Sequence, residues 1–196
     1  GPRWMTPRLV LATRNEHKLR ELHRILGAAG LDVDIVGLDE FPDAPDVRES
    51  GATFADNALL KARAASAATG LPAVADDSGL TVDALNGMPG VLSARWAGSH
   101  RTDRLNYELV LAQLEDVPDE RLGAAFACAA ALALPDGTER VAEGTVVGRL
   151  TRQPRGSNGF GDDRTLAEYS DAQKDAVSHR GRAFRALAPD IAAHVG

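Results

Sequence analysis

The sequence has little of what several classes of protein require. It holds one cysteine, Cys128, so an intrachain disulfide is excluded and a cysteine-based metal site is not expected. A buried, inert thiol in a reducing cytoplasm fits this cysteine usage. The longest nearly apolar run, residues 124–134, is too short to cross a bilayer, and the N-terminus has no apolar signal-peptide core. We therefore expect a cytoplasmic protein without membrane contact, in which residues 1–4 are a cleavage remnant or disordered and Met5 is the native start.

A surplus of basic residues is also missing. The chain has 22 Lys and Arg against 28 Asp and Glu, so its net charge is −6, and its pI is about 5.4. This balance argues against binding to a nucleic acid polymer, which needs a basic face, but allows one small anionic ligand in a local basic pocket. With 196 residues, 44% of them hydrophobic, we expect one soluble domain over residues 1–196 with room for two lobes.

Hydrophobic spacing predicts alternating strands and helices in the first half of the chain and a hairpin in the second. Residues 8–13 are typical of a buried strand, and residues 15–26 have apolar side chains at helical spacing. Thr53 and Gly70 mark the start and the end of a second helix. The predicted fold class is α/β, a two-lobed mixed sheet flanked by helices. Further strands are expected at 33–38, 72–76, 124–134 and 139–151, and further helices at 102–116 and 170–187.

The stretch TRNEHK, residues 13–18, is the first candidate site. A strand runs into a helix through this polar turn, which holds Thr13, Asn15 and Lys18. The free N–H groups at a helix N-terminus hold phosphates well, and a lysine adds a full positive charge. The alternative is an ordinary asparagine cap with a solvated lysine.

Acidic residues form the second and third candidates, in the stretches ESGATFADNALLKA and ADDSG. Mg²⁺ prefers a few carboxylate oxygens completed by water and phosphate oxygens, and Asp77 meets that need with Glu49 and Asp76. Lys61 could contact phosphate. Side chains alternate along a strand, so Asp76 and Asp77 point in opposite directions, and one of them is expected to project from the end of the strand at 72–76. The alternatives are a solvent-exposed acid and base, and an Asx turn after the strand.

The fourth candidate lies near the C-terminus. Phe160 stands in a glycine-rich loop, where it could stack on a base, and Lys174, His179 and Arg180 lie in or near the last helix. Arg and His side chains can donate hydrogen bonds to a purine edge or to phosphate. The alternative is a core phenylalanine with basic residues at the surface. Together the four clusters describe a metal, a phosphate cradle and a base pocket, which make up a nucleotide site.

The order and wording of these stretches resemble the inosine triphosphate pyrophosphatase family, the non-standard purine nucleoside triphosphate pyrophosphatases. The resemblance implies a homodimer, with the nucleotide site in the cleft between two lobes of each chain. It also implies Mg²⁺-dependent hydrolysis of ITP, dITP or XTP to the monophosphate and pyrophosphate. The matching stretches cover most of the chain and are LATRNEHKLRE, ESGATFADNALLKA, ADDSGLTVDALNGMPGVLSARWAG, PRGSNGFG and KDAVSHRGRA.

Carried over position by position, the resemblance implies a role for each matching residue. Glu49 and Asp77 would bind the metal, and Asp77 would also act as the general base. The implied contacts with the substrate are Thr13, Arg14, Asn15, Glu16, His17, Lys18, Lys61, Ser78, Arg95, Phe160, Gly161, Lys174, His179 and Arg180.

Two positions depart from the family's pattern. Arg14 stands where the family usually has glycine, which the backbone tolerates if φ there is negative. After Gly161 the family continues with an aromatic residue, Asp, Pro and a hydrophobic stretch, whereas this chain runs directly into DDRTLAEYS. Either the protein lacks that segment, or the segment is a mobile loop that this sequence leaves out. No role is therefore assigned to Asp162 or Asp163. Two other functions stay open, a Maf-like nucleotide pyrophosphatase and a non-catalytic nucleotide-binding regulator.

Overall fold

Five strands form one mixed sheet: β1 (Arg8–Leu11), β2 (Asp34–Gly37), β3 (Ala73–Val82), β4 (Gly123–Ala133) and β5 (Glu139–Arg149). The computed structural model describes residues 2, 5–99, 101–152 and 178–195. The strand order is β2-β1-β3-β4-β5, with β1 parallel to β2 and β3, and β4 antiparallel to β3 and β5. The alternating first half and the hairpin predicted from the sequence are therefore confirmed, and together they make a mixed sheet.

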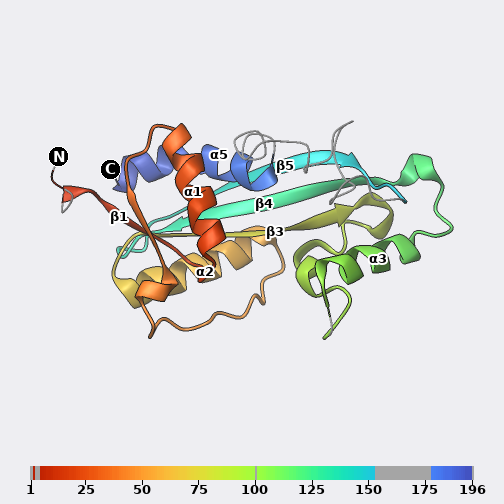
Figure 1. Cartoon of the computed structure of the whole chain (residues 1–196), viewed down its shortest axis with the longest axis horizontal. Coiled ribbons are helices and arrows are strands. Elements are labelled where there is room, and N and C mark those ends of the chain that lie inside the picture. Colours follow the sequence, from red (N-terminus) through yellow and green to blue (C-terminus); the bar gives the residue numbers. More distant parts are fainter. Residues whose placement is uncertain (1, 3–4, 100, 153–177, 196) are drawn as a thin grey trace.

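Helices cover both faces of this sheet (Figure 1). Helices α1 and α5 pack on one face and α2 on the other, while α3 lies near the far ends of the long strands. None of the helices in the described part of the chain is long and apolar enough to cross a membrane. Their bounds are α1 (Glu16–Ala28), α2 (Phe54–Thr69), α3 (Asp103–Gln113) and α5 (His179–Val195).

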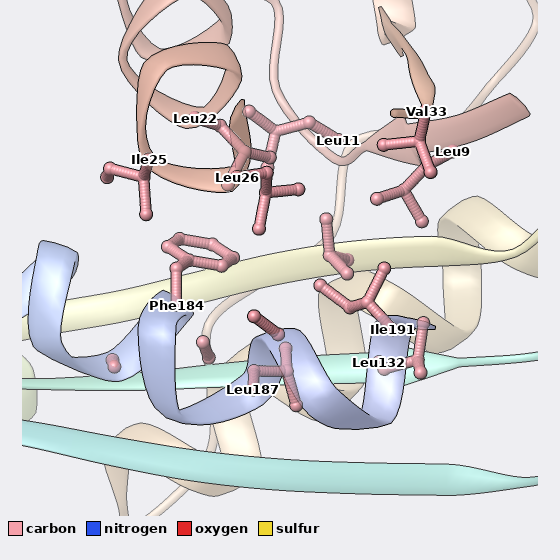
Figure 2. Close-up of a cluster of buried hydrophobic side chains, with 14 of the residues drawn as sticks. Leu9, Leu11, Leu22, Ile25, Leu26, Val33, Leu132, Phe184, Leu187 and Ile191 are labelled. Carbon is pink, nitrogen blue, oxygen red and sulfur yellow. The ribbon is translucent and has the colours of Figure 1, made fainter. Parts of the chain in front are cut away.

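Two hydrophobic clusters lie at the two ends of the long strand β3. Val74, at its start, belongs to the cluster that joins α1 and α5, where Phe184 of α5 points toward Ile25 and Leu26 of α1 (Figure 2). Leu80 and Val82, at its end, pack with Val110 of α3 in the other cluster. The two clusters account for the two lobes, and the acidic pair of β3 lies between them.

The ends of α2 follow the sequence prediction. Thr53 is its N-cap, since Thr53 Oγ1 accepts a hydrogen bond from the Asp56 N–H at 3.0 Å. Gly70 ends the helix in the left-handed conformation, with φ 69°. These caps fix where the helix begins and therefore which of its side chains face β3.

The third strand was predicted too short. It was expected to stop at Asp76, but β3 continues to Val82 and pairs with β4 along its whole length. The ADDSG stretch therefore lies inside a strand and not at its end. Antiparallel pairing satisfies the backbone there, and Gly79 lets the Gly90 carbonyl approach to 2.5 Å from the point where a Cβ would sit.

The last helix was also predicted too short at its C-terminal end. Its expected first residues, 170–177, lie outside the described part of the chain, and α5 continues past residue 187 and through Pro189 to Val195. Ile191 and Val195 are both buried in the cluster shared with α1. Their burial offsets the backbone hydrogen bond that proline cannot make.

Replacing Phe184 by alanine tests the cluster between α1 and α5. The Phe184 side chain is 1% exposed, so Phe184→Ala should lower the free energy of unfolding by about 3–5 kcal/mol. Val147→Ala is the control, because Val147 is 80% exposed on β5 and should cost less than about 1 kcal/mol. Urea unfolding measures both values, and similar losses for the two variants would contradict the assignment of the core.

Candidate active site

Asp76 and Asp77 are neighbours in β3 whose carboxylates point to opposite faces of the sheet. Asp76 pairs with Ala130, which belongs to the cluster under α1 and α5. Asp77 pairs with Ala129, which belongs to the cluster under α2. Since directly paired residues share a face, the two carboxylates have different surroundings. The alternation predicted from the sequence is confirmed.

Asp77 is held by a residue of α2 that the sequence analysis did not single out. Asn57 is completely buried, and its Nδ2 donates to Asp77 Oδ2 at 3.0 Å. Burial raises the pKa of Asp77; the bond from Asn57 lowers it in part, and the charge of Glu49 raises it again. The net shift is upward, which makes this carboxylate a stronger proton acceptor than an exposed aspartate.

Lys61 joins the loop that carries Glu49 to strand β3. Its Nζ donates to Glu49 Oε1 at 3.0 Å and to the backbone carbonyl of Asp76 at 2.5 Å. Arg95 Nη2 donates to the backbone carbonyl of Glu49 at 3.2 Å. The structure therefore brings Glu49, Lys61, Asp77 and Arg95 together, and the roles that the sequence analysis gave them stay predictions. An ammonium has three donors, so Lys61 keeps one for a further acceptor.

Glu49 and Asp77 fit a divalent cation, whereas Asp76 does not fit with them. Asp77 is buried near a second carboxylate, and the charge of Glu49 adds to the upward shift of the pKa of Asp77. A hard cation between these oxygens would relieve that repulsion. The described residues contain no cluster of three or more His, Cys, Asp and Glu side chains, so water and phosphate oxygens would have to complete the coordination. Asp76 faces the other side of the sheet.

The turn between β1 and α1 forms the predicted helix N-terminus. Asn15 is the N-cap, and its Oδ1 accepts from the His17 N–H at 2.9 Å. Thr13 Oγ1 accepts from the Asn15 N–H at 3.1 Å. Glu16 and His17 are exposed in the first turn of the helix. The Asn15 side chain is thus used as a cap, and the backbone N–H groups of the first turn remain the candidate phosphate donors.

Arg14 points away from the acidic pair and into the loop after β2. Its Nη1 donates to the Leu38 carbonyl at 3.2 Å and its Nη2 to the Ala44 carbonyl at 2.9 Å. Among the described residues, Asn86 is the sole non-glycine with positive φ, so the backbone accepts an arginine where the family usually has glycine. Beside Arg14 lies a cavity of about 310 Å³, lined at its polar side by Thr13 and Lys61.

Asp76 forms a charged cluster on the face covered by α1 and α5. Arg180 Nε donates to Asp76 Oδ2 at 3.0 Å, and Arg180 Nη1 donates to Glu21 Oε2 at 3.2 Å. Burial alone would raise the pKa of Asp76, but the charges of Arg180, Lys18 and Lys61 outweigh it and lower that pKa. Asp76 therefore stays ionised as the partner of Arg180, and Ser78 lies on the same face of β3.

His179, the first residue of α5, stacks on Phe126. The two ring centroids are 5.3 Å apart and the rings are inclined by 21°. Gly144 allows this helix to approach β5 closely, since a Cβ there would lie 2.5 Å from the His179 carbonyl oxygen and from the Ala183 nitrogen. A side chain at position 144 would therefore displace the start of α5, which carries both His179 and Arg180.

Sequence reasoning missed Asn57, Glu21 and Gly144. Asn57 and Glu21 stand inside stretches that carry the family resemblance, and a polar residue among the apolar positions of α2 was the available signal for Asn57. Gly144 gave no signal beyond being a glycine within a strand pattern. Three predicted contacts, Phe160, Gly161 and Lys174, lie outside the described residues.

A match to a protein family model shows which family this chain belongs to. The model of the Ham1 family matches residues 9–190. The chain belongs to the Ham1 family. A dITP/XTP pyrophosphatase of Streptomyces coelicolor is 60% identical over 193 residues, an alignment that covers 94% of this chain and 96% of that protein.

Solved Ham1 structures have the same fold. A HAM1 protein from Coxiella burnetii has a TM-score of 0.84 and 40% identity, and the match covers 96% of this chain and all of that one, 100%. A nucleoside-triphosphatase / dITP/XTP pyrophosphatase from Mycobacterium abscessus has a TM-score of 0.75 and 53% identity, with 94% of this chain and 99% of that one covered. These matches support the Ham1 fold across both lobes.

The stacked imidazole of His179 predicts a loss of stability in acid. Burial and the charge of Arg180 lower the pKa of His179 from 6.5 to about 4, against a partial opposing effect of Asp76. Between these two values the unfolded chain binds the proton and the folded chain does not, so the free energy of unfolding falls as the pH falls. In His179→Phe, which keeps the stacking but cannot titrate, the loss between pH 7 and pH 4.5 should be smaller by about 2 kcal/mol. Urea unfolding at both pH values measures this, and equal losses in the two proteins would refute it.

Proposed function

We propose that this chain hydrolyses the non-standard purine nucleotides ITP, dITP and XTP to the monophosphate and pyrophosphate. Membership of the Ham1 family and the name of a relative matched over 96% of its length support the reaction. The observation that carries it is the pair of carboxylates, the buried Asp77 and the partly exposed Glu49, flanked by Lys61 and Arg95. Hydrolysis of an acid anhydride needs a cation site, a base and charge for the leaving group, and these four residues can supply all three.

Glu49 and Asp77 would hold Mg²⁺, which would supply charge neutralisation of the phosphate oxygens when bound. Asp77 would take the proton of the attacking water, because burial and the neighbouring Glu49 make its carboxylate more basic. Attack at the α-phosphate releases pyrophosphate. Lys18, Lys61 and Arg95, with the N–H groups at the start of α1, would stabilise the charge that develops on it.

Recognition of the base would fall to the face of β3 that carries Asp76. Arg180 is already paired with the carboxylates of Asp76 and Glu21, so its charge is compensated and its guanidinium suits an uncharged carbonyl acceptor. Hypoxanthine and xanthine have a keto oxygen where adenine has an amino group. An amino group facing these donors would leave both partners unsatisfied, at about 1–3 kcal/mol for each lost bond.

The rival functions fit the molecule less well. A non-catalytic nucleotide-binding regulator has no use for a buried, basic Asp77 beside Glu49. A Maf-like pyrophosphatase would share the reaction but act on other nucleotides, and the match to the Ham1 model argues against it. A homodimer, a cytoplasmic location and the absence of a nucleic acid partner remain predictions, and light scattering of the purified protein tests the first.

A panel of nucleoside triphosphates tests the reaction. With Mg²⁺, ITP, dITP and XTP should give monophosphate and pyrophosphate, at rates well above the rate for ATP, because the donors of Arg180 match a keto oxygen and not an amino group. Separate assays for pyrophosphate and orthophosphate distinguish the sites of attack. Release of orthophosphate with a diphosphate product would mean attack at the γ-phosphate and would contradict the proposal.

Paired Asp→Asn variants separate the two carboxylates. Asp77→Asn should lower kcat by about 10²–10⁴-fold, since the amide cannot accept the proton, and should leave stability equal or higher because a buried charge is removed. Asp76→Asn should lower the free energy of unfolding by about 3 kcal/mol, because it leaves Arg180 with Glu21 alone. Kinetics and urea unfolding of both variants give the comparison. Near-normal turnover by Asp77→Asn would remove Asp77 from the chemistry.

A further inference from the structure

We propose that Asn57 is a positioning residue that fixes the carboxylate of Asp77 relative to the loop carrying Glu49, and so shapes the site for a divalent cation. This inference rests on the proposed function, which places the cation on Glu49 and Asp77. Asn57 itself does not touch the substrate in this role. It acts through the residue that it holds.

The contacts of Asn57 use both ends of its carboxamide. Nδ2 donates to Asp77 Oδ2 at 3.0 Å, and Oδ1 accepts from the Gly51 N–H at 2.7 Å. The residue is 0% exposed, so neither bond competes with water. One neutral side chain thus connects strand β3 to the loop that precedes α2. Because Asp77 Oδ2 accepts this bond, Asn57 sets the orientation of the whole carboxylate.

Gly51 makes this connection rigid. It lies two residues after Glu49, and a Cβ at its position would be 2.6 Å from Asn57 Oδ1 and 2.6 Å from Asp56 Cβ. No other residue fits without moving the loop or the helix. The backbone that carries Glu49 is therefore packed directly against the carboxamide of Asn57.

Lys61 provides a second connection one helical turn later. Positions 57 and 61 lie on the same face of α2. Lys61 connects Glu49 Oε1 to the Asp76 carbonyl. Asn57 connects Gly51 to Asp77 in the same way. The two connections differ in kind. Lys61 is a charged group with a donor to spare for phosphate. Asn57 is neutral and buried, and both ends of its carboxamide are bonded within the protein, so its contribution is geometric.

Binding of Mn²⁺ alone measures this contribution without any turnover. Free Mn²⁺ is followed by electron paramagnetic resonance as protein is added, for the wild type, Asn57→Ala and Asn57→Ser. Losing a residue that orients a metal ligand typically weakens metal binding 10–100-fold, so the Kd for Mn²⁺ should rise by about that factor in both variants. Asn57→Ser should destabilise the fold less than Asn57→Ala, because the serine hydroxyl can form a hydrogen bond inside the space left by the carboxamide, although it is too short to span both Gly51 and Asp77.

Ser66→Ala is the matched control. Ser66 is also a buried polar residue of α2, at 3% exposure, and its Oγ donates to the Leu71 carbonyl at 2.8 Å, away from the carboxylates. This variant should lower the thermal midpoint and leave the Kd for Mn²⁺ at the wild-type value. A second measurement is the Mg²⁺ dependence of ITP hydrolysis, where the Asn57 variants should need about 10-fold or more Mg²⁺ and regain much of kcat at saturation.

The outcomes separate this inference from the function on which it rests. A wild-type Kd for Mn²⁺ in Asn57→Ser, or a kcat that excess Mg²⁺ does not restore, would show that Asn57 only stabilises the fold and would overturn the inference. A wild-type protein that binds no Mn²⁺ and hydrolyses ITP equally well in a chelator would defeat the proposed cation site instead. A raised Kd for Mn²⁺ in both Asn57 variants, with an unchanged Kd in Ser66→Ala, supports the inference that Asn57 positions the carboxylate of Asp77.

Discussion

The two carboxylates in the middle of β3 point to opposite faces of one sheet, and each face places its own set of polar side chains around its carboxylate. On one face α2 supplies neutral and basic groups to Asp77 and to the loop before the helix. On the other face α5 and α1 supply Arg180 and Glu21 around Asp76. The strand itself separates the two environments. A single peptide unit thus divides the carboxylate proposed for phosphate chemistry from the one proposed for recognition of the base.

The surroundings decide what each carboxylate can do. Burial acts on both, but three cations surround Asp76 and lower its pKa, whereas the pKa of Asp77 is raised by burial and by a neighbouring acid. The first carboxylate is a permanent charge that orders an arginine. The second is a base that would gain from a cation. The pKa values of two adjacent residues of the same type therefore shift in opposite directions, because the helices on the two faces carry different side chains.

Local patterns predicted the parts of the fold that local physics controls. Thr53 and Gly70 were assigned as caps because one turn of chain determines a helix end, and the hairpin followed from apolar runs on both sides of a turn. The length of β3 did not follow, since Asp-Asp-Ser-Gly is a poor strand sequence and is held extended by ten pairs with β4. The passage of α5 through Pro189 likewise depends on the burial of Ile191. At the site, the sequence identified the ionisable residues. It did not identify the neutral Asn57, because the role of Asn57 depends on contacts with Gly51 and Asp77 that form in the folded chain.

The contact between Gly144 and the start of α5 has a consequence for recombination of this chain with its relatives. With 2.5 Å between the His179 carbonyl and the position of a Cβ, the hairpin strand and the helix meet backbone to backbone. Such a surface tolerates no difference in strand curvature or helix tilt between parents. A chimera that takes β5 from one Ham1 protein and α5 from another would bring together two backbones that neither parent had packed against each other, so crossover points should keep both elements from the same parent.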